Sequence, residues 1–474
     1  MFFESKPKSV PKLVYPEEDL SATCIIFKNK TYASIREGNK KLLFAWAFYD
    51  WANSVYSLVI TSALFPIFYG ALFRMEGIET IHVFGIDMER GPLISYVTSA
   101  AFLAIALITP VIAGMADYLG NKKIFMKLFC YLGSLSCVAL YWFSLSQIYF
   151  SLAAYFLGLV GFWVSYALNN SYLPDIAYKE QHNQISAKGF SLGYVGSVLL
   201  LLINLAMVMK PEVFGISGSD GDAAIKAMRY SFISVGLWWF VFSQYSFYYM
   251  PKGHPSSGSM NKLFFGGVSE LISVAKQLKN QLMLSRYLRA YFVYNMAVQT
   301  IMLVAAFYGE QEIDWGSDQE RTTGLIVSML LIQLVAIAGA LVTAKAAAKW
   351  GNIRMLMVIN TLWVLICVDA FFLETPSDFY LAAFFVGWVM GSVQALSRAT
   401  YAKFLPETED TASYFSFYDS AEKWGIVLGT LIYGAVAQYT GDMRIAIVVL
   451  GLFFLCGIVL LYRVKEPQCT PHSV

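Results

Sequence analysis

The chain contains repeated apolar runs, each long enough to cross the hydrocarbon core of a membrane. A transmembrane helix needs roughly 20 apolar residues, and we mark twelve such runs. They lie near residues 43–73, 92–116, 124–145, 149–173, 188–209, 228–250, 287–308, 322–345, 355–373, 378–399, 414–437 and 443–463. The pattern predicts an all-α integral membrane protein with twelve transmembrane helices in two six-helix, pseudo-repeated bundles.

The composition excludes a water-soluble globule. The chain is 57% hydrophobic and 14% charged, whereas soluble domains carry about 25% charged residues. The cysteines show no CxxC spacing, which indicates small reduced side chains rather than a disulfide framework or a metal site. The polar N-terminal stretch does not resemble a cleavable signal peptide, so we expect the first membrane helix to direct insertion.

Charge in the loops predicts the orientation. Basic residues gather in alternate loops, as at Lys122, Lys123 and Lys127, while a loop on the opposite side reads GEQEIDWGSDQE (309–320). Because cytoplasmic loops are enriched in Lys and Arg, we expect both termini to be cytoplasmic and the chain to span the cell inner (plasma) membrane several times.

The longest loop, 251–286, divides the chain into two halves. Apolar residues recur in it at helical spacing, which predicts either an amphipathic helix at the membrane surface or a soluble linker helix packed on the protein; they are Phe264, Val268, Leu271, Ala275 and Leu278. We therefore predict a cytoplasmic tail (1–41), a six-helix bundle (42–250), a cytoplasmic linker (251–286), a second six-helix bundle (287–465) and a cytoplasmic tail (466–474).

Two pairs of segments indicate that the halves are repeats. AGMADYLGNKKIFM (113–126) aligns with AKAAAKWGNIRMLM (344–357), so that Asn121 falls on Asn352. At nearly the same offset SYLP (171–174) aligns with KFLP (403–406). Internal repeats of this kind are typical of transporters that bind substrate between the repeats.

The first of these segments resembles the signature loop of the major facilitator superfamily. The matching residues are Asp117, Gly120, Lys122 and Lys123, while Ala113, Tyr118 and Ala348 depart from the pattern. The resemblance implies a latch at the cytoplasmic gate. Gly120 allows a tight turn, and a carboxylate at Asp117 suits the positive end of a neighbouring helix. The alternative is an ordinary basic cytoplasmic loop. Arg398 and Asp419 complete the set of gate candidates.

A narrower resemblance extends over most of the chain. The strings YDWANSVY, NNSYLPDIAYKE, AKGFSLGYVGSVLLLLINL, QALSRATYAKFLPE and SYFSFYDSAEKWG are similar to the bacterial branch of the autophagy-related vacuolar amino-acid effluxer family. This resemblance implies a secondary transporter of an amino acid. It favours a basic residue at Lys423, whereas Asp419 and Glu422 are less typical of it.

Asp50 lies in YDWANSVY, at the start of the first apolar run. A charge at the bilayer centre costs about 3 kcal/mol, so we expect Asp50 to face the bundle interior and to have a partner. Lys423 is the partner expected from the eleventh run, where it also shares a helical face with Asp419. Asp50 and Lys423 could bind the two ends of a zwitterion, or they could form gate salt bridges. Asp50 could also carry a proton or be purely structural.

Polar and aromatic residues near these charges complete the substrate-binding or coupling candidates. Paired amides on one helical face favour a cavity wall, while isolated amides more often form interhelical hydrogen bonds. The candidates are Asp50, Asn53, Tyr49, Trp51, Asn169, Asn170, Asn295, Gln299, Gln394 and Lys423. Weaker aromatic candidates are Tyr56 and Trp388.

Other functional classes find no support in the sequence. There is no HExxH, GxSxG or Walker motif, so neither an enzyme nor direct ATP coupling is predicted. We expect a monomeric carrier that contacts a small-molecule substrate and membrane lipid, with no nucleic acid, metal or cofactor, although proton coupling is compatible with the pattern. The alternatives are a transporter-fold sensor or scaffold without net flux, and an effluxer of other small metabolites or drugs.

Overall fold

The computed structural model describes residues 38–218, 220–252 and 262–466. Most of the predicted N-terminal tail, the end of the C-terminal tail and the start of the linker lie outside these ranges. Long helices make up nearly all of the described chain, as the sequence predicts. The exception is a hairpin of β1 (Thr80–Val83) and β2 (Ile86–Glu89), which pair antiparallel between the first and second long helices.

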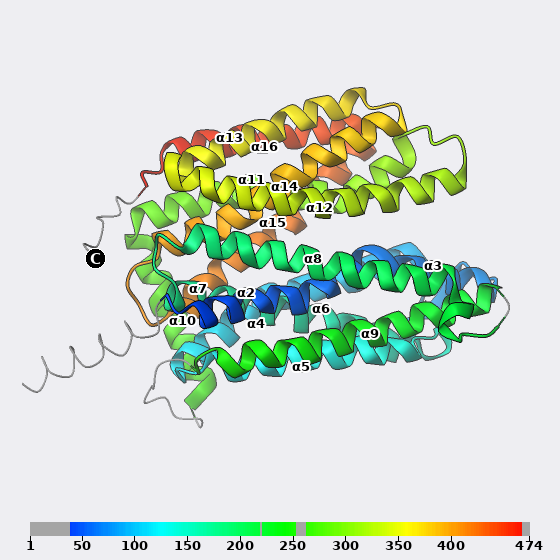
Figure 1. Ribbon diagram of the computed structural model, residues 1–474, viewed down its shortest axis with the longest axis horizontal. Coiled ribbons are helices and arrows are strands. Elements are labelled where there is room, and N and C mark those ends of the chain that lie inside the picture. The colour runs from blue at the N-terminus through cyan, green and yellow to red at the C-terminus, as the bar shows by residue number, and fades with distance from the viewer. Residues whose placement is uncertain (1–37, 219, 253–261, 467–474) are drawn as a thin grey trace, which may run out of the picture.

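Two groups of helices lie side by side (Figure 1). The first group, here called the N-terminal bundle, contains α2 (Lys40–Val55), η1 (Tyr56–Leu64), α3 (Phe65–Glu76), α4 (Arg90–Tyr118), α5 (Lys122–Ala139), α6 (Ile148–Asn170), α7 (Leu173–Ile176), α8 (His182–Met209) and α9 (Asp220–Tyr249). Short 3-10 turns add η2 (Leu140–Trp142), η3 (Leu145–Gln147) and η4 (Pro211–Phe214). The second group, the C-terminal bundle, contains α11 (Leu282–Glu312), α12 (Asp318–Trp350), α13 (Asn352–Asp369), η6 (Ala370–Phe372), α14 (Pro376–Phe404), α15 (Thr411–Thr440) and α16 (Met443–Tyr462).

The described residues contain 10 helices that are long and apolar enough to cross a membrane. The other two predicted spans, 228–250 and 414–437, are the helices α9 and α15 of 30 residues each, which do not meet this criterion. Polar residues explain the difference for α15, because it carries Asp419, Glu422 and Lys423 within two turns. A helix that faces other helices rather than lipid can keep such groups. The helical membrane fold is thus confirmed, with ten of the twelve spans evident from composition.

The first span is continuous but changes its winding in the middle. α2 runs into nine residues of π-helix, Tyr56–Leu64, and then into α3. Pro66 lies in the first turn of α3, where its missing N–H interrupts regular α-helical bonding. The change of winding therefore lies next to Pro66, and π-helical segments are often found at functional sites.

The two bundles meet along a few helices. α8 packs against α12 and α14, and α4 packs against α15. Within the C-terminal bundle α12 and α14 approach at the backbone, because a Cβ on Gly391 would overlap the carbonyl oxygen of Ala336 and a Cβ on Gly387 would lie 2.6 Å from that of Ile332. Small residues permit such close packing of membrane helices, where water is not available to drive association.

The linker forms α10 (Leu263–Asn280), which crosses the end of the molecule next to the turn between α4 and α5 (Figure 1). One face packs on α4, since a Cβ on Gly267 would lie 2.7 Å from the backbone nitrogen of Met115. The other face exposes Phe264 and Phe265, the latter with 80% of its surface accessible. α10 therefore packs on α4 with one face and exposes apolar side chains on another, and both alternatives for the linker stay open. Burial and the neighbouring Asp410 carboxylate raise the pKa of Glu270 on this helix.

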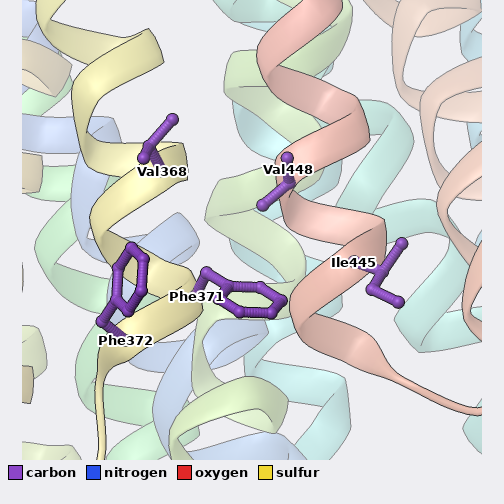
Figure 2. A pocket seen from close by; sticks show the side chains of 5 residues that line it. All are labelled: Val368, Phe371, Phe372, Ile445 and Val448. Atoms are coloured by element: carbon purple, nitrogen blue, oxygen red, sulfur yellow. The ribbon is translucent and has the colours of Figure 1, made fainter.

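A shallow apolar groove lies on the outside of the C-terminal bundle, between η6 with the end of α13 and the start of α16. Figure 2 shows its lining side chains, which are Val368, Phe371, Phe372, Ile445 and Val448. It offers no polar group, so it suits lipid chains rather than a polar substrate. The chemically distinctive groups of the protein lie instead between the bundles.

Candidate substrate pathway and gate

Asp117 joins the two bundles at the turn between α4 and α5. Gly120 has φ of 60°, a left-handed conformation that reverses the chain. Asp117 accepts hydrogen bonds from the backbone nitrogens of Ala412 (3.3 Å) and Ser413 (2.6 Å). These are the unpaired N–H groups of the first turn of α15, where the helix dipole favours a carboxylate. The structure thus shows the contact with a helix N-terminus that the sequence predicts.

The two lysines of the turn differ in their contacts. Lys122 is buried, forms an ion pair with Asp175 at 2.7 Å, and also contacts the hydroxyl of Thr411 at the start of α15. Lys123 donates to the carbonyl oxygen of Met250 at 2.8 Å and therefore stays within the N-terminal bundle. Of the two gate candidates, Lys122 bridges the bundles through this contact and Lys123 does not.

A second contact between the bundles comes from the repeat. Asn352, which aligns with Asn121, exchanges two hydrogen bonds with Asn183 on α8, at 2.7 and 2.8 Å. It also donates to Thr400 at 2.9 Å and accepts from Lys403 at 3.0 Å. Sequence reasoning did not identify this pair. The available signal was the asparagine shared by the two repeats, which is a helix cap on α5 in one half and a bridge between bundles in the other.

The partner of Asp50 is Arg398 of α14, so the predicted pairing with Lys423 is wrong. Asp50 Oδ2 accepts from Arg398 Nη2 at 3.0 Å and from Nη1 at 3.1 Å. Asp50 is 2% exposed and Arg398 1% exposed. Spacing along each helix cannot show which basic residue of the other bundle reaches Asp50, because that depends on how the bundles dock.

The guanidinium of Arg398 makes further hydrogen bonds. Nε and Nη2 donate to the hydroxyl and carbonyl oxygens of Ser186, at 3.0 and 2.9 Å, and Nη1 donates to Asn170 at 2.9 Å. The guanidinium lies over the rings of Trp46 (4.7 Å) and Phe190 (4.1 Å). A buried arginine enclosed in this way is stabilised by hydrogen bonds, charge and cation–π contact together.

Two further residues lie against the carboxylate of Asp50. Asn169 donates to Asp50 Oδ1 at 3.4 Å. Gly189 brings the backbone of α8 against the ion pair, because a Cβ there would overlap Oδ2 of Asp50 and lie 2.9 Å from Nη2 of Arg398. Asn169, Asn170 and Arg398, predicted separately, therefore gather around Asp50.

A second cluster of charged residues lies on α15, further from its N-terminus than the residues that contact Asp117. Lys423 Nζ lies 3.3 Å from the ring centre of Trp163 on α6 and 3.5 Å from Glu422. The predicted neutralisation of Asp419 by Lys423 is not observed, because neither carboxylate oxygen of Asp419 has a hydrogen-bond partner. Asp419 also lies about two turns beyond the residues that contact Asp117.

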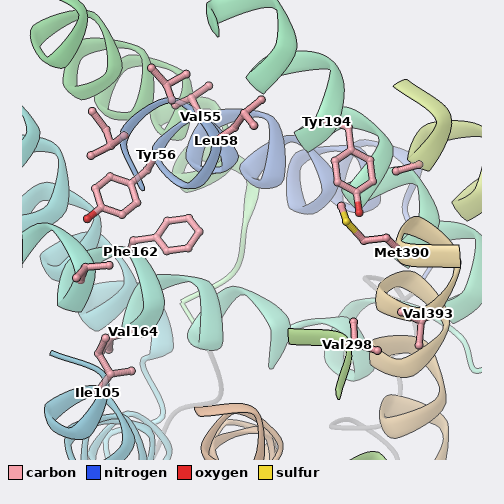
Figure 3. Close-up of a cluster of buried hydrophobic side chains, with 14 of the residues drawn as sticks. Val55, Tyr56, Leu58, Ile105, Phe162, Val164, Tyr194, Val298, Met390 and Val393 are labelled. Atoms are coloured by element: carbon pink, nitrogen blue, oxygen red, sulfur yellow. The ribbon is translucent and has the colours of Figure 1, made fainter. Parts of the chain in front are cut away.

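Amides on α11 and α14 line the same region. Gln299 donates to Glu422 at 3.0 Å and to Asn295 at 3.5 Å. Gln394 accepts a hydrogen bond from Tyr194 of α8 at 2.6 Å and so links the bundles. Figure 3 shows the Tyr194 hydroxyl beside Met390 of α14.

Three aromatic candidates of the first span make ring contacts within their own bundle. Tyr49 packs on Phe247 within the N-terminal bundle, and Trp51 stacks on Trp238 at 5.4 Å. Tyr56 stacks on Phe162 at 5.1 Å, away from Tyr194 (Figure 3). These aromatic contacts are internal packing rather than a cavity wall.

Two further candidates have no described role between the bundles. Asn53 is fully buried, its side-chain oxygen accepts from Ser54 at 3.4 Å, and its amide nitrogen has no partner. The backbone of Trp388 packs against Gly339 of α12.

The polar contacts between the bundles share a location. They come from the parts of α2, α4, α8, α13, α14 and α15 that are nearer to the turn between α4 and α5. They form layers from Asp117 with α15, through Asn183 with Asn352 and Asp50 with Arg398, to Tyr194 with Gln394. Among the described residues no group of His, Cys, Asp and Glu could hold a metal ion. The arrangement can lock one end of a passage between the bundles.

Replacing Asp117 by Asn should speed opening of this end with little loss of folded protein. The amide keeps one acceptor but loses the charge that the α15 N-terminus favours, an effect worth about 0.3–1 kcal/mol or somewhat more when buried. Transport kinetics at several substrate concentrations would check it. Wild-type rates throughout would show that this contact does not control the gate.

The comparisons with known proteins agree with this geometry. The family model described as "Vacuole effluxer Atg22 like" matches residues 38–472. An uncharacterized MFS-type transporter, YxiO of Bacillus subtilis (strain 168), is 29% identical over 435 residues, covering 90% of this chain and 96% of its own. Autophagy-related protein 22 of Saccharomyces cerevisiae (strain ATCC 204508 / S288c) is 23% identical over 416 residues, covering 76% of this chain and 75% of its own.

Solved structures show the same fold. A major facilitator superfamily transporter, FucP, in the outward conformation superposes with a TM-score of 0.67 at 12% identity, over 91% of this chain and 99% of its own. The human organic anion transporter MFSD10 superposes with a TM-score of 0.60 at 14% identity, over 90% and 99%. The fold, the Asp117 turn and the family match together show that this chain belongs to the Atg22-like vacuole effluxer family, within the major facilitator superfamily.

Proposed function

We propose that the protein is a secondary-active transporter that moves a small solute by alternating access between its two bundles. The observation that carries the proposal is the polar lock at one end of the interface, centred on the buried pair of Asp50 and Arg398. Asp50 belongs to the N-terminal bundle and Arg398 to the C-terminal bundle. Separating the bundles therefore breaks the pair and lets water reach both charges. A contact that can exchange protein partners for water suits a gate.

The solute in this proposal is an amino acid or a related zwitterion. Buried groups of both charge signs, Lys423 with Asp419 and Glu422, lie on α15 where it packs against α6, and Gln299 donates to Glu422 at 3.0 Å. A carboxylate ligand needs a cation or N–H donors, and an ammonium ligand needs an acid or an aromatic face. The resemblance of the sequence to the vacuolar amino-acid effluxer family favours the same solute class.

We further propose that the protein is a monomer in the cell membrane, that its bundles span 42–250 and 287–465, and that it transports without enzymatic chemistry.

Two measurements on purified protein test the function. A thermal-shift screen with single amino acids and peptides should find a ligand that raises the melting temperature, because ligands of the folded state stabilise it. Saturable uptake of that labelled ligand into proteoliposomes should follow.

The two measurements also separate the rival functions. Binding without flux would indicate a sensor or scaffold instead of a carrier. Flux of other metabolites or drugs, with no response to amino acids, would overturn the solute class.

The orientation gives a separate prediction. A cysteine at Ser317, in the acidic loop before α12, should react with an impermeant thiol reagent added to intact cells. One at Ser257, which lies outside the described residues, should react only after the cells are opened. Native accessible cysteines such as Cys456 would be replaced first. Labelling of Ser257→Cys in intact cells would reverse the proposed topology.

A further inference from the structure

Asp419 is a buried acid of the interface whose carboxylate makes no hydrogen bond or ion pair among the described residues. It is 3% exposed, and neither of its carboxylate oxygens has a hydrogen-bond partner. It lies on α15, which packs against α4 and α6 of the N-terminal bundle. An ionised carboxylate in such a place loses its hydration without replacement, which is among the most unfavourable arrangements for a side chain.

The nearest cation is committed elsewhere. Lys423 pairs with Glu422 at 3.5 Å and rests on the ring of Trp163 at 3.3 Å. Gln299 donates a further hydrogen bond to Glu422. Glu422 and Lys423 therefore neutralise each other, and with Asp419 ionised the cluster carries one net negative charge.

The other helices around Asp419 do not supply the missing charge. The charged groups that interact with it are Lys423 and Glu422, both on its own helix. Phenols face it from α6 (Tyr166) and α14 (Tyr401). Among the described residues, no charged group of α4, α10, α11 or α16 makes a hydrogen bond or an ion pair with Asp419. One positive charge would complete the cluster.

Asp50 shows the contrast within the same interface. It is equally buried, but it accepts two hydrogen bonds from Arg398 and one from Asn169. It can remain ionised while buried, and its role is to hold the bundles together. The two interfacial acids thus have different environments and different tasks.

We propose that Asp419 is a proton-binding site of this protein. A proton from water adds to one carboxylate oxygen and gives a neutral carboxylic acid, which is the form that stays buried between the bundles. When the bundles separate, Lys423 leaves Trp163, water enters, and the acid releases its proton to water. The proton site follows from burial and charge alone, whereas its use in coupling rests on the transport function proposed above.

The proton site can be tested without any substrate. Infrared difference spectra between acidic and alkaline pH, recorded on purified protein in lipid nanodiscs, detect the carbonyl band of a protonated carboxylic acid. The wild type should show a band that Asp419→Asn lacks. Asparagine has nearly the same shape as the neutral acid, so this variant should fold. Glu312→Gln, which removes a carboxylate that pairs with Arg444 outside this cluster, should keep the band. Identical spectra for wild type and Asp419→Asn would overturn the proposal.

The coupling role has its own measurement. With the labelled amino acid found in the thermal-shift screen, Asp419→Asn proteoliposomes should lose accumulation driven by a pH gradient and retain exchange of labelled for unlabelled solute. Wild-type uptake that ignores the pH gradient would overturn the coupling role. Absence of all flux in the wild type would overturn the transport function, and the infrared spectra would still decide whether Asp419 binds a proton.

Discussion

Asp50→Asn should open the locked end of the interface. The change leaves the Arg398 charge buried without its counter-ion, and breaking a buried ion pair from one side costs about 3–5 kcal/mol. The penalty applies only while the bundles are closed, because separation lets water reach the guanidinium. The ratio of closed to open molecules should therefore fall by roughly a hundredfold or more.

Thiol accessibility measures this shift. Ala395 is buried at the interface, and a cysteine there, in a background without other accessible cysteines, should react slowly with a membrane-impermeant reagent in inside-out vesicles. Adding Asp50→Asn should accelerate the reaction strongly. Gel filtration and the melting temperature would show that the variant is folded.

The double variant provides the control. Asp50→Asn with Arg398→Gln leaves no unpaired charge, so much of the slow reaction should return, and the two effects should be far from additive. The matched pair Asp50→Asn with Lys423→Gln should give no such recovery, because Lys423 contacts Glu422 and Trp163 instead. Unchanged labelling in the single variant would mean that the ion pair does not hold this end closed.

Gly189→Ala should open the same end without changing any charge. The added methyl would overlap Oδ2 of Asp50 and crowd Nη2 of Arg398, which belong to opposite bundles. Overpacking of a well-packed contact costs about 1–3 kcal/mol, and the strain disappears when the bundles separate. We expect faster labelling at Ala395→Cys and a weaker dependence of transport on the Asp50–Arg398 pair.

Gly434→Ala is the matched control. It makes the same substitution within a membrane helix, α15, where a Cβ would meet nothing within 4 Å. It should leave labelling and transport at wild-type levels. If Gly189→Ala behaved like Gly434→Ala, the close approach of α8 to the ion pair would have no part in gating. Combining Gly189→Ala with Asp50→Asn should add little, because both act on one contact.

The site was predictable where local sequence carries the information. Asp117 and Gly120 lie three residues apart in one turn. A glycine that allows a turn and an acid beside it form a recognisable local pattern, so both roles could be predicted. Asn169 and Asn170 stood out as buried amides at the end of a span. The pairing of Asn183 with Asn352 was missed, because the repeat marks Asn352 but nothing in the sequence marks Asn183, 169 residues away, as its partner.

Charge pairs across the interface were less predictable. Asp419 and Lys423 lie one turn apart, which suggested an ion pair, yet Lys423 turns to Glu422 and to the ring of Trp163. Helical spacing limits which side chains can meet on one helix. It does not show whether Lys423 will contact Asp419 on its own helix or an aromatic ring of the opposite bundle.

By itself, the sequence determined the membrane class, the helical architecture, the division into halves and the turn between α4 and α5. Each of these depends on apolar length, local turn chemistry or a repeat, which are properties of contiguous residues. Only the tertiary structure decided that Arg398 is the partner of Asp50, that Asp419 has none, and that Tyr49 and Trp51 pack inside one bundle. Those outcomes depend on the docking and rotation of whole helices, where a small change of angle exchanges one partner for another.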